Sequence, residues 1–387
     1  MKKFFTIILI FFSISTIFAQ ENKTTPAKKQ NTIKIGVLFS LSGRTSALGV
    51  PEKNAIEMLA KEINEKGGIL GKKIELLIND TKGKPEIAHK LAQKLIEQDK
   101  VIAIIGPTLS GPSLSIVNLA NSTKTILISC AASIKIVEPA EERKWIFKTA
   151  QNDKIALLKI YSFLKDKGVK TIAFFAENNP FGKSGQIEFE KTVIKYGFTI
   201  VENEKFNPKG TDIEKKLSNI IKEKPDAIIC WGTYPGPALV AKYLKENKIK
   251  TILVHSHGAL SKKLIQKFPG VCEGNFFPAG KLVVFEQIDD SDIQKSTLKE
   301  FFEKYKNTYG KEPNTFAGHA YDALNILAKA IQKSKSLDKN KLRNTIENLH
   351  YIGISGIFQF TPKDHNGLSK NSFEIVTLKN NKWIIAK

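Results

Sequence analysis

Small hydroxyl side chains and a glycine follow a strand-like apolar run at residues 101–111, VIAIIGPTLSG. The run is apolar without alternation and rich in β-branched residues, which predicts a strand buried on both faces of a parallel sheet. The chain then passes Ser110 and Gly111 and reaches Pro112, a residue that suits the first turn of a helix. The free N–H groups and the dipole of a helix start favour an anion, and Gly111 lets it approach closely. An ordinary strand-to-helix turn with Ser110 as the helix cap explains the same residues, so the rest of the chain has to decide.

Two further segments combine residues of chemical interest with a predicted strand end. His255, Ser256 and His257 follow one strand, and a histidine beside a serine can pair a general base with a nucleophile. No partner carboxylate can be assigned, and neighbouring strand residues point to opposite faces, so a ligand contact or a surface site is favoured over catalysis. Residues 231–235, WGTYP, follow another strand and form either the wall of an apolar pocket or a strand-to-helix turn.

Motifs of the common catalytic and nucleotide-binding classes are missing from the sequence. It contains no phosphate loop of the Walker type, no dinucleotide glycine fingerprint, no nucleophile elbow and no metal-binding histidine pair. The cysteines, Cys130, Cys230 and Cys272, lack metal-ligand spacing and allow at most one disulfide. We therefore expect no catalytic residue, no metal site, no cofactor and no enzymatic activity.

The elements that would position these segments alternate between strand and helix. Apolar runs predict strands at residues 33–39, 73–79, 101–105 and 125–129, with helices from Pro51 and at 85–98 and 112–121. The same rhythm returns with strands at 170–176, 198–202, 226–231 and 250–254 and helices at 181–196, 211–223 and 235–246. Helices at 291–309, 315–333 and 338–349 and strands at 356–360, 373–378 and 383–385 complete the chain. This alternation indicates an α/β protein of right-handed βαβ units in doubly wound parallel sheets, whose ligands bind at the carboxyl ends of the strands.

The first residues predict export. Lys2 and Lys3 precede an apolar stretch that ends near Ala19, which is the layout of a signal peptide at residues 1–19. Residues 20–32 are mostly polar and are expected to form a disordered lead-in. No later stretch is apolar over the length that a membrane-spanning helix needs. We therefore expect a periplasmic protein that is released from a cleaved signal peptide.

Size and charge limit the function classes. About 370 residues remain after cleavage, more than one core usually serves, so two lobes are expected. The formal net charge is +22, but the lysines are interspersed with glutamates along predicted helices and form no long basic block. This pattern indicates solvated helix faces and argues against nucleic-acid binding, although it can favour anionic ligands and membrane surfaces.

A series of segments, in order, resembles the type I periplasmic substrate-binding proteins. The segments are LFSLSG (38–43), INEKGGILGKKIEL (63–76), IIGPTLSG (104–111), ILISCAAS (126–133), AENNPFGKSG (176–185), AYDALNILAKAI (320–331) and SGIFQFTPKDHNG (355–367). Within that family the chain is most similar to the leucine/isoleucine/valine-binding branch, which serves ABC importers. The similarity runs from about Ile33 to the C-terminus.

The resemblance implies two doubly wound lobes that are joined by three crossings of the chain. It places these crossings near Asn152, near Gly280 and at residues 367–371. The N-terminal lobe would comprise residues 33–152 and 281–370, and the C-terminal lobe residues 153–280 and 371–387. It also implies a monomer that docks onto membrane permease subunits.

The same resemblance implies a set of ligand-binding residues. A ligand carboxylate would be held by Ser110 and by the segment from Ala131 to Ser133, where a serine replaces the family's threonine and keeps the hydroxyl. Leu48, Phe181 and Thr233 match the positions that line the side-chain pocket in relatives, where aromatic rings are common. Phe181 keeps the ring, whereas the other two residues leave more room or a different shape.

His257 departs from the family pattern. Amino-acid binders of this branch carry at that position the glutamate that receives the ligand's α-ammonium group. A neutral histidine offers one acceptor without charge, and a protonated one repels a cation. A buried ammonium without a charged partner costs several kcal/mol. We therefore expect a small carboxylate without a free α-amine, or a ligand whose amine is met elsewhere, for example by Glu177.

The expected function is that of an extracytoplasmic solute-binding protein of an ABC importer. It would trap a small carboxylate, either branched-chain amino-acid-like or a deaminated organic acid, between two closing lobes. The ligand-binding residues would be Leu48, Ser110, Ala131, Ser133, Phe181, Thr233 and His257. The same fold is compatible with a sensor that presents its ligand to a membrane receptor or a regulatory partner, and the sequence does not separate the two roles.

Overall fold

The computed structural model describes residue 1 and residues 32–386, and the residues from Thr32 onward belong to one unit. Apart from residues 1 and 32, the expected signal peptide (1–19) and lead-in (20–32) lie outside the described residues. No helix in the described part of the chain is long and apolar enough to cross a membrane.

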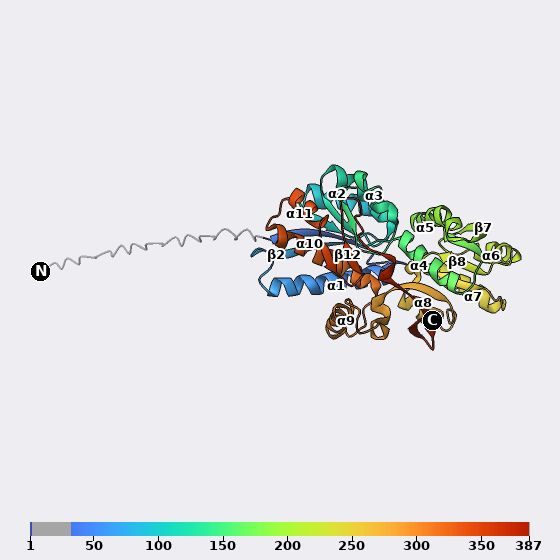
Figure 1. The fold of residues 1–387 in the computed structure, drawn as a ribbon. Helices are drawn as coiled ribbons and strands as arrows, with labels where there is room; N and C mark the ends of the chain where they lie inside the picture. Colours follow the sequence, from blue (N-terminus) through green and yellow to red (C-terminus); the bar gives the residue numbers. More distant parts are fainter. Residues whose placement is uncertain (2–31, 387) are drawn as a thin grey trace. The chain divides into compact units, whose positions relative to one another are not determined.

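The first sheet has five parallel strands in the order β2-β1-β3-β4-β5. Their bounds are β1 Thr32–Phe39, β2 Lys73–Asp80, β3 Ala103–Ile105, β4 Ile126–Ser129 and β5 Ile146–Lys148. The helices beside it are α1 Ser46–Glu65, α2 Pro85–Glu97, α3 Ser110–Ser122, α10 Thr315–Ser334 and α11 Lys339–Ile346. In Figure 1, α2 and α3 lie on one side of this sheet and α1 on the other, where it packs against α10. The predicted alternation of strands and helices therefore yields a sheet that is covered on both faces.

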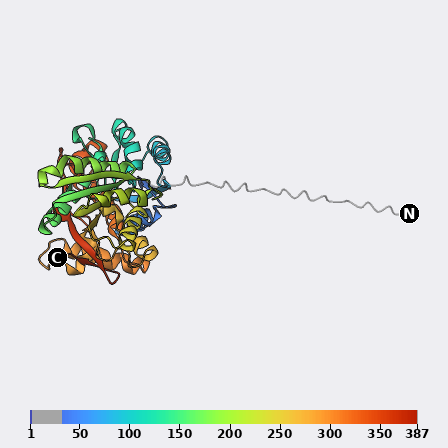
Figure 2. The same ribbon diagram turned by 90° about the vertical axis from the view of Figure 1, so that its right-hand side faces the viewer.

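The second sheet has seven strands in the order β14-β13-β10-β9-β8-β6-β7. Its parallel strands are β6 Thr171–Glu177, β7 Thr199–Phe206, β8 Ala227–Trp231, β9 Ile252–His255 and β10 Phe276–Gly280. The antiparallel edge consists of β13 Phe373–Lys379 and β14 Lys382–Ile385. Its helices are α4 Asp153–Asp166, α5 Pro180–Thr192, α6 Ile213–Lys222, α7 Gly236–Glu246 and α8 Lys262–Lys267. Figure 2 faces this half of the molecule, with the green β6–β7 region and the red C-terminal strands.

Strand β6 shows why an uninterrupted apolar run is needed in this sheet. Phe174 and Ala176 pack into the core that also contains apolar residues of α4 and α5. Ala173 and Phe175 point the other way, into the core that contains apolar residues of α6 and α7. Successive strand residues face opposite sides, so both sets must be apolar when helices cover both faces.

The chain passes between the two sheets three times. The passages run from β5 to β6 through α4, from β10 back to α10, and from β12 Ile357–Gln359 to β13. The short helix η5 Lys281–Gln287 and α9 Lys295–Tyr309 lie within the second passage, and β12 pairs with β11 His350–Ile352. The fold is thus the expected pair of doubly wound lobes, while the residue boundaries given above for each lobe stay predictions.

The observed elements differ from the predicted ones mainly at their ends. Helix α3 begins at Ser110, whereas the sequence predicted a start at Pro112. Proline is tolerated in a first helical turn because its missing N–H has no partner there, so the two residues before it can also be helical. Strand β3 begins at Ala103 and α5 ends at Thr192, both inside their predicted ranges. The three cysteines are buried and unpaired.

Candidate functional site

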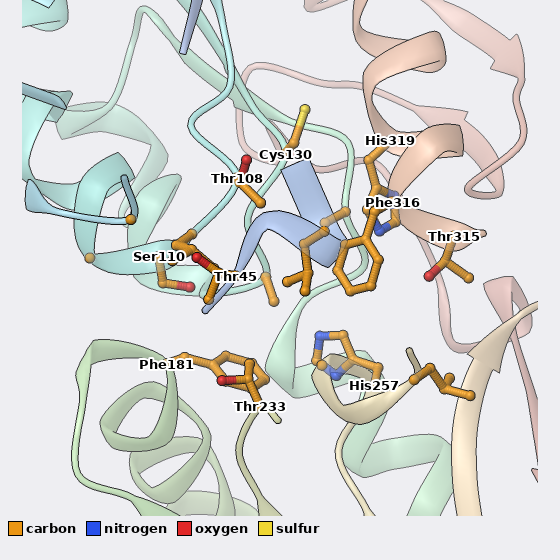
Figure 3. A pocket seen from close by; sticks show the side chains of 18 of the residues that line it. Thr45, Thr108, Ser110, Cys130, Phe181, Thr233, His257, Thr315, Phe316 and His319 are labelled. Atoms are coloured by element: carbon orange, nitrogen blue, oxygen red, sulfur yellow. The ribbon is translucent and has the colours of Figure 1, made fainter. Parts of the chain in front are cut away.

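A cavity of about 210 Å³ lies where the carboxyl ends of strands from both sheets meet. Thr108 follows β3, Cys130 follows β4, Thr233 follows β8 and His257 follows β9, and all of them line the cavity. Figure 3 shows Thr108 and Ser110 on one side of the space and Phe181, Thr233 and His257 on the other. The carboxyl ends of parallel strands are where ligands bind in doubly wound sheets, so this cavity is the candidate site.

Five of the predicted contact residues line the cavity, namely Leu48, Ser110, Phe181, Thr233 and His257. They come from α1, α3, α5 and the ends of β8 and β9, so the predicted set draws on both sheets. Ala131 and Ser133 are not among the lining residues, and the residue between them, Ala132, is. The structure therefore brings most of the predicted residues together, while their roles in ligand binding stay predictions.

Ser110 is the first residue of α3 and is buried. The cap position before it is Leu109, whose side chain makes no capping hydrogen bond. The first N–H groups of a helix have no acceptor within the helix, and the helix dipole adds positive potential there. Ser110 Oγ accepts a hydrogen bond of 3.2 Å from the Ser133 N–H, which fixes its position beside the cavity. This side of the cavity is consequently suited to an anionic group.

The Ser133 side chain is engaged away from the cavity. Its Oγ donates a 2.7 Å hydrogen bond to Ser184 Oγ on α5. Ser184 Oγ in turn donates to Asp153 Oδ2 at 2.5 Å. All three side chains are buried, so the hydroxyl that the sequence assigned to a ligand carboxylate here joins a chain of hydrogen bonds between the two halves of the molecule.

His257 lies in an apolar surrounding and is only 9 % exposed. Its ring packs edge-on against Phe181, Trp231 and Phe373, with centroid distances of 5.5, 5.6 and 5.5 Å. Within residues 32–386 neither of its ring nitrogens has a hydrogen-bond partner. Burial, followed by the nearby positive charge of Lys148, lowers the pKa of His257 to about 3, against an opposing effect of the Gln151 backbone. The imidazole is therefore neutral at physiological pH.

Helix α10 contributes lining residues that the sequence did not single out, among them Phe316 and His319. His319 is buried, and its Nδ1 lies 2.9 Å from Ser355 Oγ. Burial lowers the pKa of His319 to about 3, with further contributions from Lys148 and His257. Both residues lie in a helix that the sequence predicted, but local pattern does not reveal which of its turns faces the cavity.

Arg44 is a further lining residue that the sequence did not single out. Its Nη1 donates to Glu177 Oε1 at 3.3 Å and to the Tyr234 carbonyl oxygen at 2.9 Å. These contacts link the loop before α1 to the ends of β6 and β8. The sequence does show a basic residue directly after the LFSLSG segment, but its partner, Glu177, lies 133 residues away and could not be assigned from local pattern.

Glu177 does not reach the cavity as an acceptor for a ligand amine. Its Oε2 accepts hydrogen bonds from the N–H and the hydroxyl of Thr233, at 2.8 and 3.0 Å, and its Oε1 binds Arg44. It is fully buried and is not a lining residue. The option that Glu177 receives an amine therefore finds no support in this geometry. Among the described residues that line the cavity none is acidic, and Arg44 is the only permanently charged side chain.

The chain is similar to known ligand-binding proteins in both sequence and fold. Residues 32–382 match the family described as periplasmic binding protein. A Leu/Ile/Val-binding protein of Rhizobium johnstonii is 23% identical over 306 residues, which is 79% of this chain and 80% of that protein. An extracellular ligand-binding receptor from Rhodopseudomonas palustris has a TM-score of 0.85 and 27% identity, covering 93% of this chain and 100% of that one.

A second solved structure carries its ligand. The branched-chain amino acid transporter substrate-binding protein of Streptococcus pneumoniae, in complex with isoleucine, has a TM-score of 0.79 and 25% identity. The match covers 92% of this chain and 99% of that one. The family model spans most of the chain, and the neighbours share its fold over nearly their whole length. The chain belongs to the periplasmic binding proteins, as a type I member related to the Leu/Ile/Val-binding proteins.

Proposed function

We propose that the protein is the extracytoplasmic solute-binding subunit of an ABC importer and captures a small carboxylate in the cavity between its two sheets. The observation that carries this proposal is the cavity itself, which takes its walls from both halves of the molecule. A ligand that touches both halves stabilises the closed arrangement over an open one. Similarity to a branched-chain amino acid transporter substrate-binding protein supports the importer role.

The carboxylate is proposed to bind at Ser110. This residue combines a buried hydroxyl with the N-terminus of α3, which runs for 13 residues. Oriented N–H groups and the helix dipole favour a negative group at this point, and the hydroxyl adds a directional donor. Ser110 Oγ already accepts a hydrogen bond from the Ser133 N–H, which leaves its own proton available for a ligand oxygen.

The ligand is proposed to lack a free α-ammonium group. A buried ammonium requires a carboxylate or several oriented acceptors, because removing it from water is costly. The described lining residues provide no carboxylate, and His257 is neutral. Branched-chain amino acids as such are therefore poor ligands on this proposal, whereas their deaminated counterparts meet no such penalty.

A thermal-shift screen of small carboxylates and amino acids tests the proposal. A ligand present at 100 times its Kd should stabilise the protein by about 2.7 kcal/mol, which is a clear rise in melting temperature. Ser110→Ala should abolish most of that rise, whereas Ser122→Ala, at an exposed position near the other end of α3, should leave it intact. A flat melting temperature across the whole screen contradicts the proposal.

The importer role is tested separately in cells. Deleting the gene should abolish uptake of the labelled ligand that the screen identifies, and restoring the wild-type gene should recover it. Unchanged uptake together with a lost cellular response to the ligand would show the sensor role instead.

A further inference from the structure

We propose that the ligand carries, besides its carboxylate, an uncharged oxygen group, a hydroxyl or a carbonyl, and that His257 receives it. This inference rests on the proposed carboxylate function and adds the chemical class of the second polar group. The ligand class is thus a small carboxylic acid with an apolar body and one neutral oxygen substituent.

The first observation is that His257 is buried with its polar atoms unused. The residue lines the cavity, and within the described chain both Nδ1 and Nε2 are buried without a hydrogen-bond partner. Buried polar atoms are almost always hydrogen-bonded in folded proteins, so an unsatisfied pair in a cavity wall needs a specific reason. A ligand atom that completes the hydrogen bond is such a reason.

The second observation is the geometry around the ring. Phe181, Trp231 and Phe373 contact His257 edge-on and fix its orientation without offering it a polar partner. Figure 3 shows the ring projecting into the space that faces Phe316 and His319. The Gln151 backbone lies nearby, and both ring nitrogens keep their hydrogen-bonding capacity for a group that occupies the cavity.

The third observation concerns charge. A neutral imidazole presents one N–H donor and one lone pair. A hydroxyl oxygen can use either, and a carbonyl oxygen can accept from the N–H. An ammonium needs negative charge that the lining does not provide, and a second carboxylate at His257 would meet an uncharged ring. Both charged alternatives are therefore disfavoured, and a neutral oxygen group fits.

The size and lining of the cavity limit the rest of the ligand. The walls include apolar side chains, among them Leu48, Phe181 and Phe316. Such walls favour a hydrocarbon body, branched aliphatic or aromatic.

Calorimetric titration of matched acids tests the inference on the full mature chain. One series is 4-methylpentanoate, its 2-hydroxy and 2-oxo forms, and leucine. The other series is benzoate and 4-hydroxybenzoate. In at least one series, an oxygen-bearing acid should bind on the order of tenfold more tightly than the unsubstituted acid, because the unsubstituted acid leaves the buried imidazole unpaired. The series in which the added oxygen increases the affinity shows whether the body of the ligand is aliphatic or aromatic.

His257→Phe is the critical variant, since it keeps a ring in the aromatic surrounding and removes both nitrogens. The preference for the oxygen-bearing acid should disappear in His257→Phe, while the unsubstituted acid binds at least as tightly as in the wild type. His89→Phe, at an exposed histidine of α2, should retain the preference. If His257→Phe fails to fold, the imidazole ¹⁵N resonances of wild-type His257 provide the readout, and they should shift on addition of the oxygen-bearing acid alone.

The outcomes separate the two proposals. Binding of the unsubstituted acids with no gain from oxygen overturns this inference and leaves the carboxylate function standing. Leucine as the tightest ligand overturns it as well, and also removes the argument against an ammonium. Absence of binding by every acid in both series contradicts the proposed function itself.

Discussion

His257 and Ser110 lie on facing sides of the cavity and differ in the charge that each can accept. Ser110 lies at a helix N-terminus, where an anion is stabilised, and His257 lies in an aromatic surrounding that keeps it neutral. An α-ammonium group would need an acid at the position where this chain has a histidine. On the proposed function, the ligand class therefore depends on the His257 side chain more than on the size of the cavity.

The substitution His257→Glu should convert the specificity. The new carboxylate would supply the negative charge that an α-ammonium needs, so leucine should gain at least about tenfold in affinity and 4-methyl-2-oxopentanoate should lose a similar factor. His257→Gln, which is polar but uncharged, should not gain leucine binding. Calorimetry with both ligands on both variants measures this, and tight leucine binding by the wild type would show that the argument from charge is wrong.

At the residue scale, the sequence anticipated the residues that directly follow a strand or begin the next helix. Ser110, Phe181, Thr233 and His257 belong to this class, and all of them line the cavity. It could not anticipate Phe316 and His319, because their place in the cavity wall depends on how α10 packs against α1, which is distant in the sequence. Nor could it anticipate that the Ser133 hydroxyl bonds Ser184, because that contact spans 51 residues and depends on how the two halves meet.

At the scale of elements, a series of buried hydrogen bonds through Ser110, Ser133, Ser184 and Asp153 connects α3, α5 and α4. Ser133 follows β4, Ser184 lies on α5, and Asp153 begins α4 at the first passage between the sheets. Burial raises the pKa of Asp153 above its usual range, and its hydrogen bonds to Ser184 and to the Ile134 N–H oppose that rise. These hydrogen bonds therefore link residues beside the cavity to α4, which connects the first sheet to the second.

Ser184→Ala should destabilise the protein by about 1–3 kcal/mol, since it removes the donor to a buried carboxylate and the acceptor of Ser133 at once. Ser218→Ala, on α6, removes a hydroxyl that bonds only its own helix at the surface and should cost much less. Urea unfolding of both variants at pH 7.5 makes the comparison. Equal stability of the two variants would mean that the buried chain contributes nothing measurable.

The elements themselves were the most predictable part of the molecule, because apolar runs between glycine and proline signals determine them locally. The first residues of the helices were less predictable. Helix α3 begins two residues before Pro112, since backbone geometry in a first turn does not depend on the residue that most visibly favours it. The antiparallel pairing of β13 with β10 was also beyond the sequence pattern, which indicates a strand but not its neighbour.

At the scale of the whole molecule, buried histidines should make stability depend on pH. Burial lowers the pKa of His255 to about 4, and its hydrogen bond to Asn275 opposes this only in part. The unfolded chain binds a proton on that side chain near pH 6.5, so between these values the unfolded state holds more protons than the folded one. Stability is therefore lost as the pH falls below about 6.5.

His255→Phe should remove this share of the pH dependence. Between pH 7.5 and pH 5 the wild type should lose about 2 kcal/mol more than the variant. Burial raises the pKa of Asp322 to about 6 and acts in the opposite direction, but it does so equally in both proteins. Urea unfolding at the two pH values measures the difference, with His89→Phe as the surface control, and a gap that does not change with pH would contradict the prediction.

The two-lobed plan and the position of the cavity followed from βα alternation, since parallel strands present their carboxyl ends together. The central claim is that the cavity holds a carboxylate at Ser110 and an uncharged group at His257, on facing sides. A crystal structure of the protein with its tightest-binding acid tests this most directly. We predict a carboxylate oxygen within hydrogen-bond distance of Ser110 Oγ and a hydroxyl or carbonyl oxygen at a ring nitrogen of His257. A ligand ammonium in contact with His257, or a carboxylate bound away from α3, would contradict the account.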